Sequence, residues 1–229
     1  MLAGQKGYGS NGKQNFLFPL EDMFITQGEW QYTYSHDGTY AMDFQGWSNG
    51  SRVYQCPCYA PFDCHCVEIF GSSAPAVLWE SDNEINFVDG TVGYACISFT
   101  HEDNTFQRHY VGQTLSQGDI ISHTGTMGAS GDHVHIEAKK GQASTSSNFH
   151  QNTYGAWMLT GSTHLYDVMG VNDTVLTRTY YDNHNNQRIY YPWLDFTVNN
   201  PTPHPVPPTI PKKHKFPWFI VNSKKLHRM

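Results

Sequence analysis

Two histidines separated by one residue, His133 and His135, follow a glycine-rich turn just past the middle of this 229-residue chain. The adjoining residues Val134 and Ile136 are apolar, a pattern typical of a β-strand with one buried face. Side chains alternate between the two faces of a strand, so both imidazoles are predicted to lie on the same face. Such a pair can bind a metal ion, or one ring can bind while the other moves protons.

A histidine and an aspartate, His36 and Asp43, lie further upstream, seven residues apart around a glycine turn. A catalytic zinc ion takes three protein ligands, His and Asp among them, and keeps a fourth position for water. His36, Asp43 and one of the two later histidines would form such a set, with the other histidine beside the water. The chain has no His-Glu-x-x-His motif, so a zinc site carried by one helix is not indicated.

The elements that must hold these residues are short apolar runs separated by turn residues. Their lengths and spacing are typical of antiparallel strands, and convincing long amphipathic helices are absent from the sequence. Strands are predicted at 53–54, 67–70, 76–79 and 94–99, with turns at 81–83 and 89–90. The predicted fold class is therefore mainly β, with short helices or loops and an irregular C-terminal extension.

Three segments accompany the histidines in a fixed order. They are Val53–Asp63, which ends in Tyr-Ala-Pro-Phe-Asp, Val111–Ile121, and Gly125–Glu137, which holds both late histidines. With the early His–Asp pair, these segments resemble the lysostaphin/LytM-type zinc metallopeptidases of the M23 family over roughly residues 15–140. The seven-residue His–Asp spacing is longer than the common one and is similar to variants in phage lysis and tail-associated endopeptidases. The resemblance implies an antiparallel β-sheet peptidase domain.

The resemblance also implies roles for particular residues. His36, Asp43 and His135 would hold one Zn²⁺ per chain, and His133 would be a catalytic histidine beside the metal. Glu137 is predicted on the same face as His135, since it lies two residues further along the strand. It is either a partner that orients a metal-binding histidine or an ordinary charge at a strand end.

The resemblance implies a second catalytic histidine, for which the chain offers His101 and His109. His101 lies 133 − 101 = 32 residues before His133, whereas His109 lies 133 − 109 = 24 residues before it. The first separation is close to the family's usual one, so we assign the second catalytic role to His101. His109 is then a substrate-side or structural residue. His101 and His133 would exchange protons with the attacking water and the leaving amine.

Composition limits the classes of function. The formal net charge is −6, and aromatic residues make up 14% of the chain, against only 15% charged residues. A nucleic-acid-binding protein normally carries a basic surface, so that class is not favoured. Many aromatic residues and few charges favour a β domain with an aromatic-lined groove.

The chain is predicted to divide into four regions. Residues 1–14 form a flexible N-terminal segment without the apolar core of a signal peptide. Residues 15–165 form the peptidase domain, 166–198 an aromatic-rich extension that packs on it, and 199–229 a Pro-rich linker with a basic aromatic tail. The tail either contacts a partner, a wall polymer or a lipid surface, or is a solvated end. Its apolar run at 216–221 is far shorter than the ~20 residues needed to span a bilayer.

Five cysteines require a separate interpretation, because four of them form two Cys-x-Cys pairs. They are Cys56, Cys58, Cys64, Cys66 and Cys96. Free buried thiols, a disulfide across a hairpin, and a metal site that includes His65 are three alternatives. The short loop between the pairs argues against structural zinc, and the odd count argues against a complete disulfide framework.

Two classes of function follow from the resemblance. The first is a zinc metalloendopeptidase that hydrolyses peptide bonds in bacterial peptidoglycan, as a phage lysis or virion-associated enzyme. The second is a catalytically inactive M23-fold component that binds the cell wall or builds a phage tail. A lysis enzyme would act from the host cytoplasm after release to the cell wall, whereas a virion enzyme would belong to the phage tail. Its partners would be peptidoglycan peptides and, in a virion, other phage tail proteins.

Overall fold

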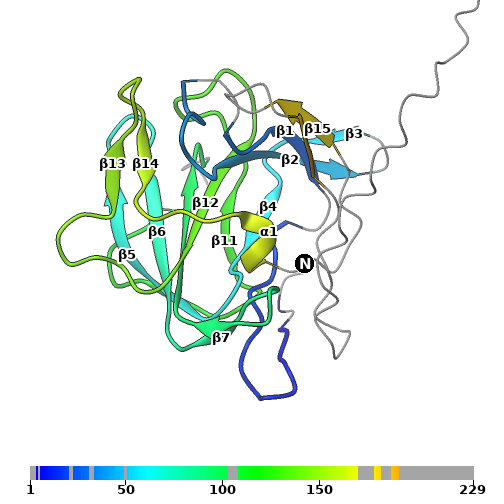
Figure 1. Ribbon diagram of the computed structural model, residues 1–229, viewed down its shortest axis with the longest axis vertical. Coiled ribbons are helices and arrows are strands. Elements are labelled where there is room, and N and C mark those ends of the chain that lie inside the picture. The colour runs from blue at the N-terminus through cyan, green and yellow to red at the C-terminus, as the bar shows by residue number, and fades with distance from the viewer. Residues whose placement is uncertain are drawn as a thin grey trace, which may run out of the picture.

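The fold is built around one large antiparallel sheet (Figure 1). The computed structural model describes residues 4, 6–20, 23–30, 34–48, 51–102, 108–169, 178–181 and 187–190. The large sheet has eight strands in the order β1–β2–β12–β9–β6–β5–β10, and β3 pairs with β2 at the same edge. Every pairing in it is antiparallel, which confirms the predicted fold class.

The elements are short, as the spacing of apolar runs and turns predicts. The strands of the large sheet are β1 (Met23–Gln27), β2 (Met42–Ser48), β3 (Ser51–Val53), β5 (Cys64–Phe70), β6 (Ala76–Ser81), β9 (Ala95–Thr100), β10 (Thr114–Leu115) and β12 (Val134–Lys140). Two-stranded pairs are formed by β4 (Pro57–Tyr59) with β11 (Ile120–His123), β7 (Ile85–Asn86) with β8 (Val92–Gly93), β13 (Phe149–Gln151) with β14 (Trp157–Leu159), and β15 (Arg178–Tyr181) with β16 (Gln187–Tyr190). The one helix in the described part of the chain is α1 (Leu165–Val168).

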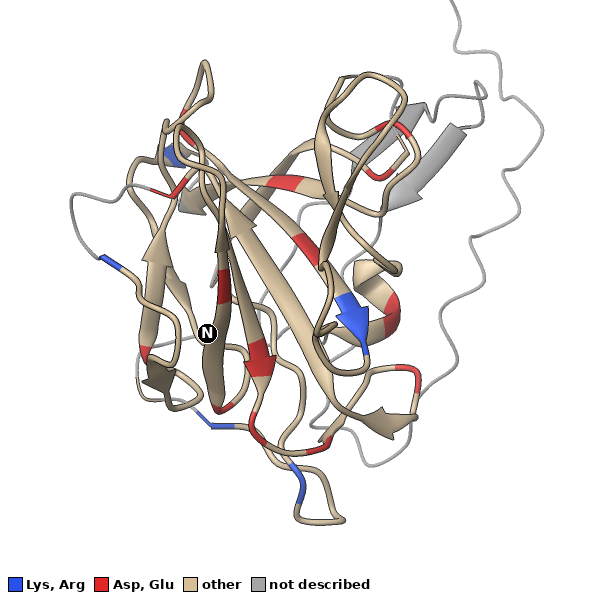
Figure 2. Cartoon of the chain, turned by 90° about the vertical axis from the view of Figure 1, so that its left-hand side faces the viewer, with Lys and Arg blue, Asp and Glu red and all other residues tan. Residues whose placement is uncertain are grey.

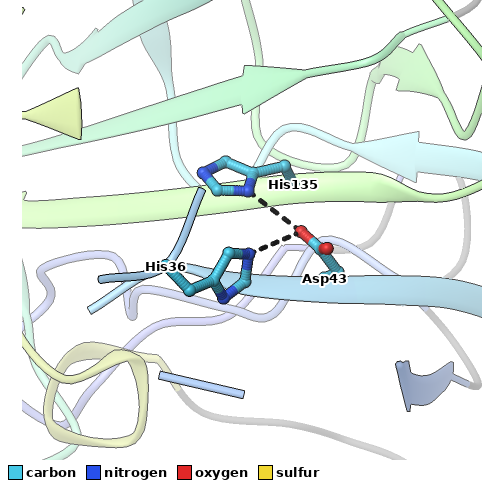
Figure 3. A group of neighbouring side chains, drawn as sticks. All are labelled: His36, Asp43 and His135. Atoms are coloured by element: carbon cyan, nitrogen blue, oxygen red, sulfur yellow. Dashed lines mark hydrogen bonds and ion pairs between the residues drawn. The ribbon is translucent and has the colours of Figure 1, made fainter. Parts of the chain in front are cut away.

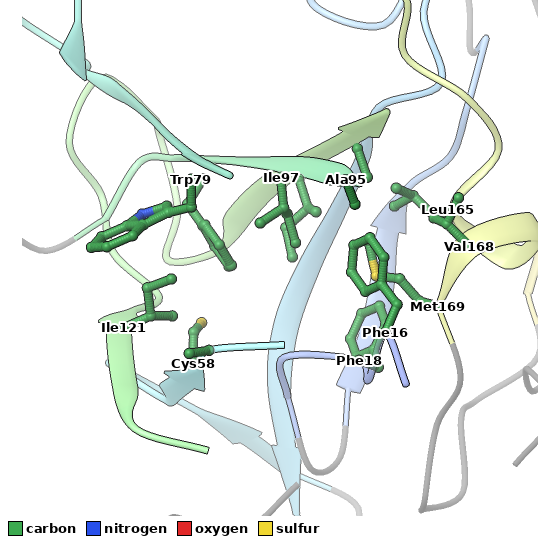
Figure 4. Packing of buried hydrophobic residues seen from close by; sticks show 14 of the residues in the cluster. Phe16, Phe18, Cys58, Trp79, Ala95, Ile97, Ile121, Leu165, Val168 and Met169 are labelled. Carbon is green, nitrogen blue, oxygen red and sulfur yellow. The ribbon is translucent and has the colours of Figure 1, made fainter. Parts of the chain in front are cut away.

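One face of the large sheet carries the main hydrophobic core (Figure 4). Strand β12 illustrates the alternation that creates it: Val134, Ile136 and Ala138 are fully buried in this core, and the residues between them point to the other face. Trp79 and Ile97 come from β6 and β9, and residues before β1 and from α1 close the layer. Burying each such large side chain stabilises the fold by about 1.5–3 kcal/mol.

The opposite face is divided into an apolar and a polar half. At the β5–β6–β9 side, Leu78 and Cys96 pack against Phe149 and Leu159 of the β13–β14 hairpin in a second, smaller cluster. At the β2–β12 side, buried polar residues take the place of apolar ones. This half of the face carries Asp43, Gln45, His135 and Glu137.

Several predicted segments can be followed in the structure. Residues 6–14, expected as a flexible segment, are hydrogen-bonded to the domain: the Gly7 amide donates to Oε1 of Gln117, and Nδ2 of Asn11 donates to Oδ1 of Asn86. After residue 165, Val168 and Met169 are buried in the main core. The linker and tail predicted at 199–229 lie outside the described residues. No helix in the described part of the chain is long and apolar enough to cross a membrane.

All five cysteines are free thiols in the structure, so it contains neither the disulfide nor the cysteine metal site that we considered. Cys58, Cys64, Cys66 and Cys96 are buried, and Cys56 is partly exposed. Burial raises the pKa of the Cys66 thiol to about 11 and that of Cys96 to about 12. Buried, protonated thiols of this kind behave as small apolar side chains.

Candidate metal centre

Strand register brings the candidate ligands together. His135 on β12 is paired with Asp43 on β2 at one side and with Thr100 on β9 at the other. The loop before β2 carries His36, whose ring lies beside that of His135 at a centroid distance of 4.9 Å (Figure 3). His36, Asp43 and His135 are all buried. Residues distant in sequence therefore converge, because β12 lies between β2 and β9 in the sheet.

The three side chains present two nitrogens and one carboxylate to a common point. The Asp43 Oδ1 atom lies 3.1 Å from Nε2 of His36 and 2.9 Å from Nδ1 of His135. Among the described residues, this is the one group of three or more His, Cys, Asp or Glu side chains close enough to share a metal ion. Its potential ligand atoms all lie within 4.8 Å of one another.

The remaining ring nitrogens of the two ligand-type histidines are held by other groups. Nδ1 of His36 donates to the carbonyl oxygen of Gly28 at 2.8 Å, because a carbonyl can only accept. Nε2 of His135 donates to Glu137 Oε1 at 3.4 Å. When each ring is neutral, these bonds leave the nitrogen that faces Asp43 without a hydrogen, as metal binding requires.

Glu137 connects this site to the covering hairpin. Its carboxylate accepts hydrogen bonds from the hydroxyl of Thr39 at 2.7 Å and from the amide of Leu159 at 3.1 Å. The side chain therefore lies on the His135 face, as the strand alternation predicts. Burial by itself would raise the pKa of Glu137, but His135 and the other donors lower it below its ordinary value.

The surroundings of Asp43 and His135 shift both pKa values in the direction that favours the charged form of each side chain. Burial alone would raise the pKa of Asp43, yet the charge of His36 and the hydrogen bond from His135 lower it well below the ordinary value. Burial would lower the pKa of His135, but Asp43 and Glu137 together raise it to about 10. Two buried carboxylates, Asp43 and Glu137, therefore favour positive charge at His135.

Two further histidines lie next to this group. The rings of His101 and His133 are 4.7 Å apart, and His133 Nε2 lies 3.5 Å from Asp43 Oδ2. His101 donates from Nδ1 to the carbonyl of Met127, and His133 donates from Nδ1 to the carbonyl of Gly131, each at 2.8 Å. An imidazole that donates from Nδ1 carries no hydrogen on Nε2 when it is neutral, so that nitrogen can accept one.

His101 has a strained backbone and a shifted pKa. It directly follows β9, and its φ of 69° lies in the left-handed region that non-glycine residues rarely adopt. Burial and the neighbouring His135 lower the pKa of His101 to about 4, so the ring is neutral at pH 7. Strained residues of this kind are concentrated at functional sites.

His109, the other candidate for the second catalytic role, makes different contacts. Its Nε2 atom lies 3.1 Å from Oε2 of Glu102, its Nδ1 lies 3.3 Å from Oε1 of Gln113, and its ring meets that of Trp79 edge to face. These contacts favour the structural alternative for His109, which stays a prediction.

No family model matches the chain. Morphogenesis protein 1 of Bacillus phage B103 is 36% identical over 174 residues, which cover 72% of this chain and 42% of that protein. The chain thus spans about two fifths of the length of this relative.

Solved structures similar to the chain include LytU, with 25% identity, a TM-score of 0.37, and coverage of 52% of this chain and 75% of that one. They also include the M23 metalloprotease pseudoalterin, with 14% identity, a TM-score of 0.40, and coverage of 77% and 90%. The chain is similar to M23 peptidases.

The sequence analysis missed the backbone groups of the site. The carbonyls of Gly28, Met127 and Gly131 and the amide of Leu159 orient side chains here. Every residue has a backbone carbonyl, so the residue type does not show which carbonyls orient a side chain. Only the position of Gly131, two residues before His133, could have suggested the carbonyl that His133 contacts.

Proposed function

We propose that this chain is an M23-type zinc-dependent endopeptidase that hydrolyses peptide bonds in bacterial cell-wall peptidoglycan. The observation that carries the proposal is the convergence of His36, Asp43 and His135 beside two further histidines, His101 and His133. The donor set fits zinc, which prefers nitrogen and carboxylate oxygen ligands and keeps an open position in catalytic sites. When bound, Zn²⁺ supplies a Lewis acid that polarises the scissile carbonyl and lowers the pKa of a bound water.

The chain's own residues would perform the proton transfers. His101 is neutral at pH 7 and presents Nε2, so it can accept a proton from the attacking water. His133 presents Nε2 beside it and can hydrogen-bond the developing oxyanion or return a proton to the leaving amine. Transfers of this kind contribute on the order of 10²–10⁴ in rate. No serine or cysteine nucleophile takes part, so no covalent intermediate is expected.

The test is release of new amino groups from purified Gram-positive peptidoglycan, with and without chelator, by wild type and His133→Ala. Chelator-sensitive release that the substitution abolishes supports the endopeptidase, and mass analysis of the fragments identifies the bond. Intact walls of several chemotypes after incubation with zinc-loaded protein would contradict it. His133 is partly exposed and lies outside the core clusters, so its substitution is expected to leave the fold intact.

A second candidate is a catalytically inactive component of a phage particle that binds the wall or builds the tail. The relative's name, a morphogenesis protein, is the observation that favours it. The same relative leads us to propose a virion setting for the enzyme in preference to release from the host cytoplasm. Mass spectrometry of purified phage particles tests this setting, because a lysis enzyme would be absent from them.

A further inference from the structure

A pocket of about 450 Å³ is lined in part by Gly131 and Asp132, the two residues before His133. One wall is formed by Arg52, Tyr54 and Gln55, at and just after β3. The other wall is the segment that leads into β12, with Thr126, Ser130 and residues 131–132. Since the carbonyl of Gly131 holds the ring of His133, the pocket and the catalytic histidine share one loop.

Arg52 lies on the same face of the sheet as Asp43, because it pairs with Trp47 and Trp47 is an even number of residues from Asp43 on β2. Gln45 lies two residues after Asp43 on β2, and its side chain therefore points to the same side. Its Oε1 atom accepts a hydrogen bond of 2.9 Å from Nε of Arg52. Trp47, the partner of Arg52, lies four residues after Asp43 on β2. Four residues of a strand cover about 13 Å, so Arg52 and Asp43 are separated by about that distance along the strand. An extended peptide spans this distance in about four residues.

Arg52 is held in place but has no anionic partner among the described residues. Its guanidinium carbon lies 5.4 Å from the centre of the Tyr54 ring. Nε is bonded to Gln45, which leaves both Nη groups for another acceptor. An arginine fixed by stacking and by one hydrogen bond loses little freedom when it binds a carboxylate with two parallel bonds.

Basic residues are scarce elsewhere on the molecule, as Figure 2 illustrates for one side. Three other described lysines already have acidic partners: Lys6 with Asp63, Lys13 with Glu84 and Lys140 with Asp89. Lys139 lies on the same face of β12 but is buried and hydrogen-bonded to Asn148. Arg52 is the one cation among the residues that line the pocket.

The opposite wall contains one acidic group, and both of its oxygens already accept hydrogen bonds. Asp132 is buried, and its two oxygens accept hydrogen bonds from the hydroxyl of Thr124 at 2.7 Å and from the amide of Gln55 at 3.0 Å. Gln55 has a φ of 51°, a left-handed conformation that this bond helps to hold. The hydroxyls of Thr126 and Ser130 are additional donors for an anion in the pocket.

We propose that this pocket is a substrate subsite that binds a carboxylate group of the peptide, with Arg52 as its cation. The inference rests on the proposed peptidase function and names a class of substrate, an acidic peptide. The carboxylate belongs to a residue within about four positions of the scissile bond. It comes from a side chain or from the end of the peptide, and both sources present the same chemistry to Arg52.

The experiment uses four otherwise identical peptides from the wall, with the side-chain carboxylate free or amidated and the terminal carboxylate free or amidated. Zinc-loaded wild type, Arg52→Gln, Arg52→Lys and Lys13→Gln are compared by kcat/KM. Amidation of the recognised carboxylate is expected to lower wild-type kcat/KM by about 10- to 100-fold. In Arg52→Gln, the ratio of kcat/KM for the free peptide to kcat/KM for the amidated peptide is expected to be near one. Arg52→Lys is expected to keep part of the wild-type ratio.

Lys13→Gln is the matched control, because it removes one exposed positive charge at the Glu84 pair and should preserve the wild-type ratio. Equal cleavage of all four peptides by wild type and Arg52→Gln would overturn the subsite while leaving the peptidase proposal intact. Binding of the same peptides to His133→Ala, measured by calorimetry, separates the two proposals further. If wild type cleaves no peptide, tighter binding of the peptide with the free carboxylate still supports the subsite, provided that Arg52→Gln abolishes this preference. Equal binding of the free and amidated peptides overturns the subsite.

Discussion

His109 Nε2 lies 3.1 Å from Glu102 Oε2, and the two side chains are only 5% and 8% exposed. This buried pair joins the end of β9 to the segment that precedes β10. His101, by contrast, turns its ring toward His133. The two candidate histidines therefore have different surroundings, which leads to opposite expectations for their substitution.

We predict that His101→Ala lowers kcat by about 10²- to 10⁴-fold with little change in stability, since it removes a proton acceptor. His109→Ala should instead lower the free energy of unfolding by about 3–5 kcal/mol, because Glu102 is left buried without its partner. Peptidase assays and denaturant titrations of both variants test this. An inactive but stable His109→Ala together with an active His101→Ala would reverse the assignment.

Removal of metal is predicted to abolish activity, and added zinc to restore it. His135→Ala should lose zinc and activity together, because it removes one of three ligand-type groups. His133→Ala should retain stoichiometric zinc and lose turnover. Metal analysis after dialysis, beside the peptidase assay, distinguishes the two variants. Full activity in excess chelator would contradict the mechanism.

Glu137→Gln is predicted to weaken zinc binding by about 10- to 100-fold, because the substitution removes the carboxylate that orients His135. The amide retains an oxygen for the Leu159 amide or the Thr39 hydroxyl, so the fold should persist. Competition with a zinc chelator of known affinity measures the change. Unaltered zinc affinity would assign Glu137 a purely structural role.

The Glu102–His109 pair is predicted to make stability depend on pH. Burial alone would lower the pKa of His109, but Glu102 raises it above its ordinary value. The folded-state pKa of His109 lies above its unfolded value of about 6.5. The pair therefore stabilises the folded protein fully below about pH 6.5, and this stabilisation is lost as the pH rises through the folded-state pKa. The difference in unfolding free energy between wild type and Glu102→Gln should therefore shrink at alkaline pH. His65→Gln, in an exposed pair with Asp82, should show little effect at any pH.

Native protein at neutral pH is predicted to react with a thiol reagent at Cys56 alone, and at all five cysteines only after unfolding. The other four thiols are buried, and burial raises their pKa values. A reducing agent should accordingly leave the melting temperature unchanged. A large drop on reduction would indicate a disulfide, since these typically contribute about 2–4 kcal/mol.

Much of the site could be predicted because strand alternation is a local property of the chain. A period of two is sufficient to place Glu137 on the His135 face and Ile136, which lies between them, in the core. Residue chemistry likewise selected His36 and Asp43 as metal-ligand types before any geometry was known. The spacing of turns and apolar runs was enough for the antiparallel fold class.

The tertiary structure decided which distant groups meet, because strand register and loop paths depend on contacts across the whole domain. His101 reaches the site since Thr100, the residue before it, pairs with His135. The contact between Arg52 and Gln45 likewise depends on the pairing of β3 with β2. The need for glycine at position 46 also comes from tertiary packing, because a Cβ added there would lie 2.2 Å from the Cβ of Cys56. Such relationships carry no periodic signal in the sequence, so the folded chain alone reveals them.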